Sequence, residues 1–157
     1  MSATGGAVTL LPVAASELDV FVAMFLVYAA EMLPYDPLGP EPASAAALRR
    51  DFADALVEES AELLWVAAGG EHAGLLVLQC FDEADGAEPA IEIAECYVES
   101  RFRGTGVGRA AVEQVLARER ARGTAVVEAG VLRDNPALGF WRKLGFEVRA
   151  YRTARRP

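Results

Sequence analysis

Six consecutive residues, Arg103-Gly104-Thr105-Gly106-Val107-Gly108, form the part of this chain that points most directly to a ligand. Glycine at alternate positions lets the backbone turn tightly and approach a ligand closely, because no Cβ stands in the way. The segment follows an apolar, strand-like run over 90–98 and opens a helix-like run over 107–122. Unpaired N–H groups and the positive end of a helix dipole meet at such a junction, which favours an anion and most plausibly a pyrophosphate.

The glycine spacing excludes two common phosphate-binding motifs. A Walker loop ends in Gly-Lys-Ser or Gly-Lys-Thr, and this segment has no such ending. A dinucleotide-binding loop requires Gly-x-Gly-x-x-Gly, whereas position 109 is Arg. The remaining pattern is Arg-x-x-Gly-x-Gly. It indicates either a loop that binds a phosphate-bearing ligand or an ordinary glycine-rich turn between a strand and a helix.

A second segment, Asn135 to Glu147, begins with an Asn, continues as a short helix-like stretch and ends with a Gly-Phe pair that enters a strand-like run. These two segments, together with the strand-like run Ile93 to Val98, resemble the signatures of the GNAT N-acetyltransferase superfamily and occur in the same order. The resemblance is strong over residues 90–147 and is only architectural before them.

The resemblance implies that acetyl-CoA binds in a cleft between two strands that splay apart, 95–98 and 125–132. Backbone N–H groups of the glycine loop would hold the pyrophosphate, and the backbone of Tyr97 and Val98 would pair with the pantetheine arm. An N–H group there would face the thioester carbonyl, where a donor to the developing oxyanion contributes on the order of 3 kcal/mol. The cofactor-binding residues that the resemblance implies are Tyr97, Val98, Arg103, Gly104, Thr105, Gly106, Val107, Gly108, Arg109, Asn135, Phe140 and Trp141.

Acetyl transfer to an amine also requires a base, because the ammonium form of an acceptor cannot attack. Glu95 is the first candidate for this base, since the family often has an acidic residue at this place. Glu92 and Glu128 are weaker candidates. A solvated or ion-paired strand residue is the alternative interpretation of Glu95.

The departing thiolate requires a proton. Many family members have a Tyr where this chain has Trp141, and an indole N–H hydrogen-bonds but does not transfer its proton. Tyr97 is the candidate acid, with Tyr28, Tyr35 and water as alternatives. No metal ion is expected to take part.

The acceptor side is expected in the loop after the first helix. Glu31, Tyr35 and Asp36 could hold a cationic amine by charge and by the face of the ring. The leading hypothesis is therefore an N-acetyltransferase that acts on a primary amine of a small-molecule or peptidic acceptor. Alternatives are acetylation of a protein N-terminus or lysine, and a non-catalytic acyl-CoA-binding regulatory domain.

Hydrophobic periodicity and turn residues predict the elements that position these residues. Strands are expected over 7–13, 63–68, 73–81, 90–98, 125–132 and 146–152, and helices over 16–33, 43–59, 107–122 and 136–144. Turns are expected at Gly69–His72, which leaves His72 in solvent, and at Asp85-Gly86. The predicted fold class is α/β, a central mixed sheet flanked by helices in the GNAT order βααββββαβαβ, in one domain over 1–157.

Charge is distributed unevenly along the chain. The net charge is −8, but residues 1–99 carry −16 and residues 100–157 carry +8. A basic C-terminal part suits a phosphate-bearing cofactor, an acidic N-terminal part suits a cationic acceptor, and the net charge disfavours nucleic acid. An uneven distribution of solvated charges is the alternative for the acidic part.

The sequence also predicts the compartment. The uncharged apolar run Val20 to Ala30 is shorter than the ~20 residues that a membrane span needs. No secretion signal is apparent, and Cys80 and Cys96 lie in apolar strands where buried reduced thiols are expected. A cytoplasmic protein is therefore expected, and a homodimer is left open.

Overall fold

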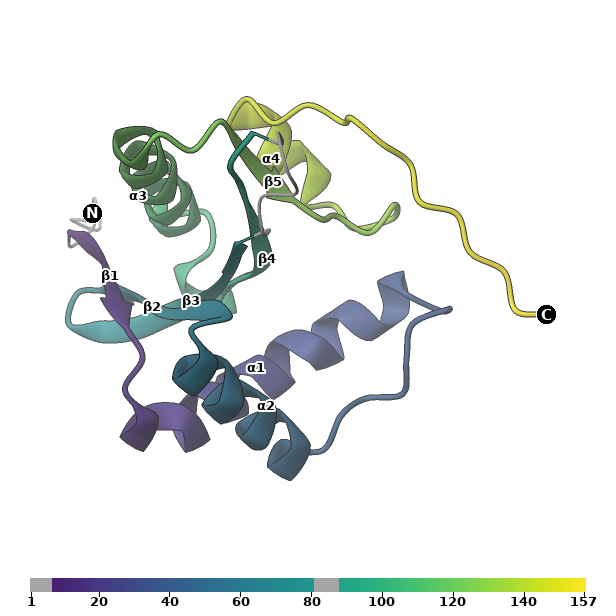
Figure 1. Cartoon of the computed structure of the whole chain (residues 1–157), viewed down its shortest axis with the longest axis horizontal. Helices are drawn as coiled ribbons and strands as arrows, with labels where there is room; N and C mark the ends of the chain where they lie inside the picture. The colour runs from purple at the N-terminus through teal and green to yellow at the C-terminus, as the bar shows by residue number, and fades with distance from the viewer. Residues whose placement is uncertain (1–6, 81–87) are drawn as a thin grey trace.

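One mixed sheet forms the centre of the computed structural model, which describes residues 7–80 and 88–157. Its five strands lie in sequence order: β1 (Val8–Pro12), β2 (Ala61–Ala68), β3 (Glu71–Cys80), β4 (Ala90–Val98) and β5 (Val126–Ala129). Strands β1 to β4 pair antiparallel, whereas β5 pairs parallel to β4 (Figure 1). The predicted parallel pair is therefore present, and it is connected through a helix, as parallel strands require.

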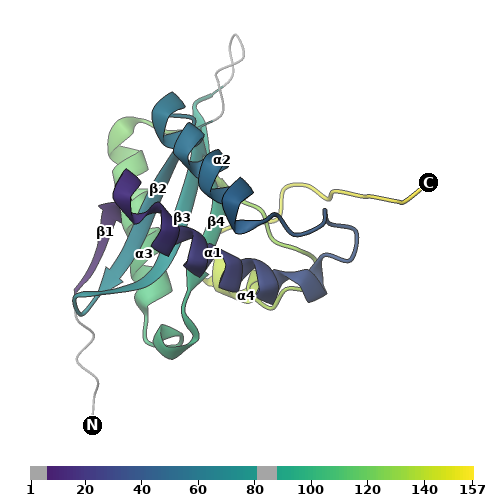
Figure 2. The same ribbon diagram turned by 90° about the horizontal axis from the view of Figure 1, so that it is seen from below.

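Helices cover both faces of the sheet (Figures 1 and 2). On one face, α1 (Leu18–Met32) and α2 (Ala45–Glu58) bury Phe21 and Phe52 against Trp65. On the other face, α3 (Val107–Arg122) and α4 (Leu138–Lys143) enclose a second apolar cluster. Three short 3-10 helices complete the described elements: Ala15–Glu17, Leu33–Tyr35 and Ser100–Phe102.

The predicted α/β class and mixed sheet are confirmed, but the element order is not correct in detail. Three described strands lie between α2 and α3, where the predicted order has four. The strand predicted over 146–152 is absent, because that segment has no ladder partner in the described part of the chain. Phe146 packs on the core and Arg149 pairs with Glu128, so side chains rather than a ladder hold this segment. The turn predicted at Asp85-Gly86 lies outside the described residues.

Local contacts correct several smaller expectations. The helix predicted over 16–33 begins as a 3-10 turn at Ala15, where Glu17 accepts from the Ala14 N–H at 2.8 Å. His72 lies on β3 and not in the turn, and its ring stacks on Trp65 at 3.9 Å between centroids. Cys80 is exposed rather than buried, because it lies with Gln79 at the exposed end of β3.

Helix α1 is more apolar than the short run Val20 to Ala30 suggests. By length and composition alone, residues 15–35 meet the requirement for a membrane span. In this structure Leu18, Phe21 and Val22 of the helix are buried in the cluster against the sheet. The apolar composition of α1 is therefore partly explained by its packing, while Val20 and Val27 remain exposed.

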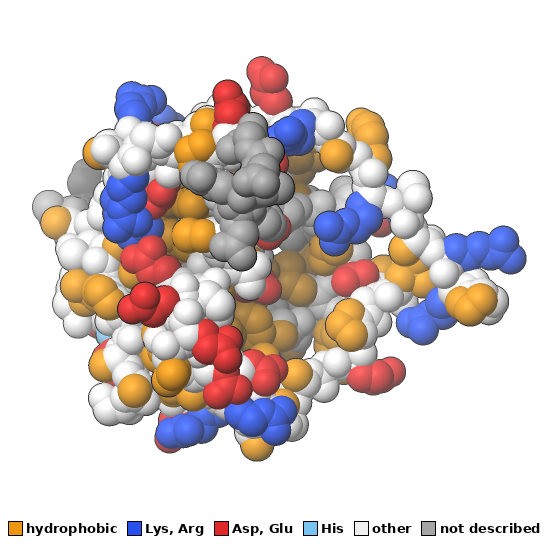
Figure 3. Space-filling view, in the orientation of Figure 1, with side chains coloured by type: hydrophobic (Ala, Val, Ile, Leu, Met, Phe, Trp, Pro, Cys, Tyr) orange, Lys and Arg blue, Asp and Glu red, His pale blue; other side chains and the backbone are white. Residues whose placement is uncertain are grey.

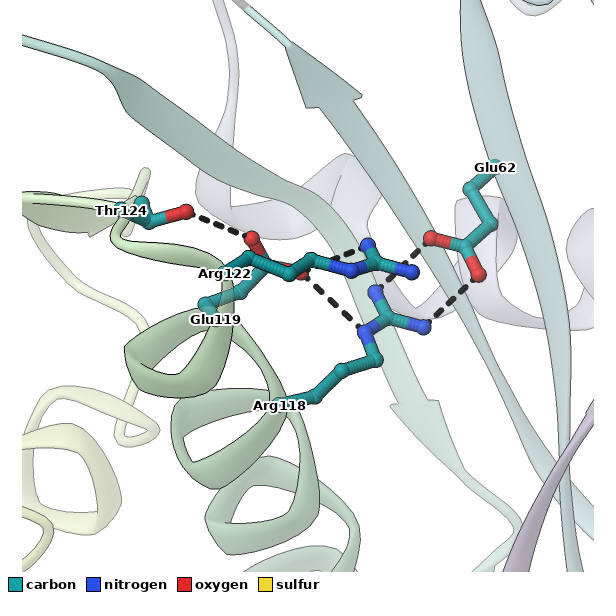
Figure 4. A network of polar contacts seen from close by, with 5 residues as sticks. All are labelled: Glu62, Arg118, Glu119, Arg122 and Thr124. Carbon is teal, nitrogen blue, oxygen red and sulfur yellow. Dashed lines mark hydrogen bonds and ion pairs between the residues drawn. The ribbon is translucent and has the colours of Figure 1, made fainter.

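A charged network fixes the end of α3 beside the sheet (Figure 4). The buried Glu119 carboxylate accepts from Thr124 at 2.7 Å and from Arg118 and Arg122 at 3.1 Å each. Arg118 also donates to both oxygens of Glu62 on β2, at 2.7 and 2.8 Å. Burial raises the pKa of Glu119, but the hydrogen bonds from Thr124 and Arg118 outweigh it and the net pKa is lowered. The network ties β2 to the turn from which β5 begins.

Candidate active site

The glycine loop ends in the first turn of α3. Gly104 and Gly106 have φ of 74° and 89°, which glycine adopts readily and other residues rarely do. The first described backbone bond of α3 runs from the Ala110 N–H to the Gly106 carbonyl at 2.9 Å. The preceding N–H groups at the helix start are therefore free for a ligand, and a Cβ on Gly104 or Gly106 would meet no atom within 4 Å. An open, donor-rich turn of this kind fits a pyrophosphate.

The place at which the cleft is predicted is where β4 and β5 cease to pair. Their ladder joins Ala90–Ile93 to Val126–Ala129 and ends there. Beyond Ile93, strand β4 continues to Val98 with only β3 as its described strand partner. This leaves one backbone edge of β4 available between the ladder and the glycine loop. The edge is the feature that an extended amide-bearing arm, such as pantetheine, would require.

Part of that edge is already engaged. The Arg103 Nε donates to the Val98 carbonyl at 2.8 Å, so this oxygen is not free. On the opposite edge, β3 approaches closely at Gly74, where a Cβ would clash with the Tyr97 carbonyl. The close approach fixes the end of β4 against β3.

Glu95 lies at a bulge of β4. The pairing with β3 shifts between Val77 and Leu78, so that Ala94 has no directly opposed residue. Glu95 is half-buried beside the hydroxyl of Tyr28 on α1. Burial raises the pKa of the Glu95 carboxyl, the hydrogen bond from Tyr28 lowers it, and the net pKa is above the ordinary value. A carboxylate with a raised pKa is a stronger base, which suits proton abstraction.

Tyr97 is buried, and its hydroxyl donates to Glu31 Oε1 at 3.3 Å. Burial, followed by the Glu31 charge, raises the pKa of the Tyr97 hydroxyl. The other Glu31 oxygen accepts from Arg103 Nη2 at 2.7 Å. The predicted acceptor residue Glu31 thus binds both the predicted acid Tyr97 and the predicted cofactor residue Arg103 through its carboxylate. Glu31 and Arg103 are 72 positions apart, so no spacing pattern could have indicated this contact.

Asn135 orients the turn before α4. Its Oδ1 accepts from the Ala137 N–H at 2.9 Å, and its Nδ2 donates to Met32 Sδ at 3.4 Å. Trp141 is buried on the other side of α4, with ring centroids 5.1 Å from Phe140 and 5.0 Å from Phe146. Phe140 lies near the start of α3, where a Cβ on Gly108 would be 3.5 Å from its ring. Trp141 is therefore a core residue, and Phe140 lies closer to the loop.

The remaining predicted residues lie around these groups. Glu92 and Glu128 are direct partners in the β4–β5 ladder, and Arg149 pairs with Glu128. Tyr35 and Asp36 are partly exposed after α1, and among the described residues neither side chain has a hydrogen bond or ion pair to another predicted site residue. Figure 3 shows a hollow between α1 and the C-terminal segment, with hydrophobic side chains at depth and acidic side chains near its rim.

Two other kinds of chemistry find no support at this site. Over residues 7–80 and 88–157, no group of three His, Cys, Asp or Glu side chains is arranged to hold a metal ion. Burial raises the pKa of the Cys96 thiol to about 12, so that the thiol stays protonated at neutral pH and is a poor nucleophile.

Comparison with known proteins identifies the family and the fold. The model of the acetyltransferase (GNAT) family matches residues 26–146. An uncharacterised N-acetyltransferase of Methanocaldococcus jannaschii is 39% identical over 57 residues, which are 36% of this chain and 25% of that protein. The chain therefore matches only a quarter of the length of this relative.

Solved structures share the fold over nearly the whole chain. A ribosomal-protein-alanine N-acetyltransferase from Brucella melitensis has a TM-score of 0.72 at 16% identity, covering 96% of this chain and 99% of that one. An aminoglycoside acetyltransferase from an uncultured soil metagenomic sample has a TM-score of 0.67 at 20% identity, with coverage of 96% and 99%. At these identities the likeness shows the fold alone.

Proposed function

Since this chain belongs to the GNAT acetyltransferase family, we propose that it transfers an acetyl group from acetyl-CoA to a primary amine of a small-molecule or peptidic acceptor. The reaction proceeds by direct attack in a ternary complex. The observation that carries this proposal is the free edge of β4 beyond Ile93, which connects the glycine loop to Glu95. An anion-binding turn, an extended backbone edge and a basic carboxylate thus follow one another along a single path.

The residues that would hold acetyl-CoA lie along this path. The N–H groups at the start of α3 would bind the pyrophosphate, with Arg109 of the first turn nearby. The backbone around Tyr97 would pair with the pantetheine amides, and Phe140 and Asn135 would line the thiol end. Acetyl-CoA supplies an activated acetyl thioester and a thiolate leaving group.

Glu95 is the proposed base. Its half-buried carboxylate would take one proton from the acceptor ammonium, directly or through a water, and so produce the neutral amine that forms the new C–N bond. A backbone N–H near Tyr97 would stabilise the oxyanion that develops as the C–N bond forms. When the C–S bond then breaks, the nitrogen loses one more proton, which balances the proton that the departing thiolate takes up.

Protonation of the thiolate is a separate step. Tyr97 is the proposed donor, but its proton is directed to Glu31, so that it must first be released from that contact. Because a thiol has a reference pKa of ~8.5, its anion can also leave unassisted and take a proton from water. The proposed mechanism therefore depends more on Glu95 than on Tyr97.

The acceptor is proposed to be cationic. Glu92, Glu95 and Glu128 lie on or beside the free end of the β4–β5 ladder, and Arg149 is paired with Glu128. The aminoglycoside acetyltransferase that shares this fold acts, by its name, on an aminoglycoside, and the Brucella enzyme acts, by its name, on an alanine of a ribosomal protein. The negative charge near Glu95 favours a small amine that carries several positive charges over a peptide end that carries one.

A turnover assay tests the proposal. The protein is mixed with acetyl-CoA and a panel of amines (polyamines, aminoglycosides, and peptides with free N-termini or lysines), and released thiol is measured. Thiol release that depends on both the amine and the protein supports the proposal. Binding of acetyl-CoA without turnover on any amine would contradict it and would favour the second candidate.

That second candidate is a non-catalytic acyl-CoA-binding regulatory domain. Two observations favour it: Trp141 is a core residue with no transferable proton, and the hydroxyl of Tyr97 is engaged by Glu31. Under this alternative, acetyl-CoA binds through the same loop and Glu95→Gln leaves the affinity for acetyl-CoA unchanged.

A further inference from the structure

The last turn of α1 contacts the cofactor side of the site at two consecutive residues. Glu31 binds Arg103 at 2.7 Å and Tyr97 at 3.3 Å, and Met32 accepts from Asn135 at 3.4 Å. These three partners come from the loop before α3, from β4 and from the turn before α4. The end of α1 therefore contacts the glycine loop, β4 and the turn before α4 together. The same helix leads directly into the predicted acceptor loop at Tyr35.

The Arg103 side chain is directed by these contacts. Nε donates to the Val98 carbonyl, Nη2 donates to Glu31, and the guanidinium carbon lies 5.4 Å from the centre of the Tyr97 ring. A guanidinium has five N–H donors, and two of them are used in holding the side chain on β4 and α1. These contacts orient the guanidinium toward β4 and α1.

We propose that Glu31 and Arg103 are positioning residues which tie the acceptor-side helix α1 to the cofactor loop and to Tyr97. In this role Arg103 acts through the placement of the loop and of β4, and not as a ligand of the pyrophosphate. Glu31 likewise acts on Arg103 and Tyr97 and does not bind the acceptor. The inference rests on the proposed function, because it assigns roles within the same site.

The contact can be removed without loss of the fold. The side chains of Arg103 and Glu31 are 47% and 37% exposed, and ion pairs with this much solvent contribute little to stability. The same loop provides a matched control. Arg101 pairs with Glu71 at 3.1 Å and therefore ties the loop to β3 rather than to α1. Changes at Arg101 and Glu71 remove the same kinds of charge near the loop, and they leave the contacts of α1 intact.

A double-mutant cycle with two acetyl donors tests the proposal. Glu31→Ala, Arg103→Met and the double variant are compared with wild type in kcat/KM for the acceptor. The donors are acetyl-CoA and acetyl-pantetheine, which lacks the phosphates. We expect each single change to lower kcat/KM about fivefold with both donors. The kcat/KM of the double variant should be no lower than that of the less active single variant, because coupled residues do not act additively. The cycle with Arg101→Met and Glu71→Ala should show changes below about twofold with either donor.

Two results would overturn the proposal. If the Arg103→Met defect disappears with acetyl-pantetheine, Arg103 is a phosphate ligand. If the Glu31 and Arg103 effects multiply, the two residues act independently. Calorimetric titration of wild type with acetyl-CoA separates this inference from the proposed function, because a wild-type protein that binds no acetyl-CoA contradicts the function itself. If wild type binds but does not turn over, the same cycle is measured in the dissociation constants of CoA and pantetheine. Additive effects there would also overturn the proposal.

Discussion

Replacement of Glu95 by Gln tests the proposed chemistry most directly. Gln keeps the shape of the side chain, and its carbonyl can still accept from the Tyr28 hydroxyl that lies beside Glu95. What it loses is the ability to take a proton. A positioned general base contributes about 10² to 10⁴ in rate, so we expect kcat to fall at least about 100-fold, or about 2.7 kcal/mol in the barrier. The affinity for acetyl-CoA should change little, because the loop and the free edge of β4 are untouched.

The pH dependence gives a second readout. Burial raises the pKa of Glu95 above its ordinary value of 4.5, so the acidic limb of the wild-type pH–rate profile should lie above that value and should vanish in the variant. The effect of pH on stability has the opposite sign to that of a carboxylate whose pKa is lowered by folding, which is the usual case. A raised folded pKa means that the native state binds more protons, so stability falls as pH rises from the ordinary pKa through the folded one. Glu95→Gln escapes this loss and should melt no lower than wild type at neutral pH.

Steady-state kinetics across pH, acetyl-CoA calorimetry and thermal melting provide the three measurements. Glu58→Gln is the control, since Glu58 is exposed at the end of α2 and the substitution makes the same change in charge. An acidic limb that persists in Glu95→Gln would refute the assignment and direct the search to Glu92, Glu128 or solvent. A lower melting temperature at neutral pH would refute the sign argument.

Three further outcomes are expected. Gly106→Glu should abolish acetyl-CoA binding, measured by calorimetry, because the new carboxylate repels the pyrophosphate. The protein should still fold, because a non-glycine residue at a φ of 89° costs only about 1–2 kcal/mol of strain. Unchanged affinity for acetyl-CoA would contradict the assignment of the loop. Trp141→Tyr should raise the KM for acetyl-CoA with flat or lower kcat, because a packed indole is lost from the core, and a gain in kcat would show instead that a missing hydroxyl limits the reaction. Glu119→Gln should lower the free energy of unfolding by about 1–3 kcal/mol at neutral pH. Because the pKa of Glu119 is lowered in the folded state, melting curves should show the difference between wild type and variant becoming smaller as the pH falls below 4.5.

The sequence was sufficient for those parts of the fold that depend on local pattern. The run 107–122 was predicted as a helix with the residues that α3 now has, and Gly123 ends it with φ of 84°. The strand over 146–152 was predicted by the same kind of pattern and is absent. A helix closes its own hydrogen bonds, whereas a strand requires a partner edge, and the segment after Phe146 lies beside β5 through side chains only. Local sequence therefore predicts α3 better than it predicts the edge of the sheet.

In the candidate site, too, local sequence predicts the features that depend on contiguous residues better than those that depend on tertiary packing. The glycine loop is a contiguous backbone feature, so composition and spacing were enough to locate it, and the positive φ of Gly104 and Gly106 follows from the same residues. The contacts of Glu31 depend on where α1 ends relative to β4, which is set by the packing of Phe21 and Tyr28 on the sheet. A charge on a helix end is ordinarily solvated, and only that packing brings Glu31 to Arg103 and Tyr97. Residues of a site that are held by tertiary packing are therefore the ones whose roles sequence assigns least well. For this reason Glu31, predicted as an acceptor ligand, is better understood through its partners than through its charge.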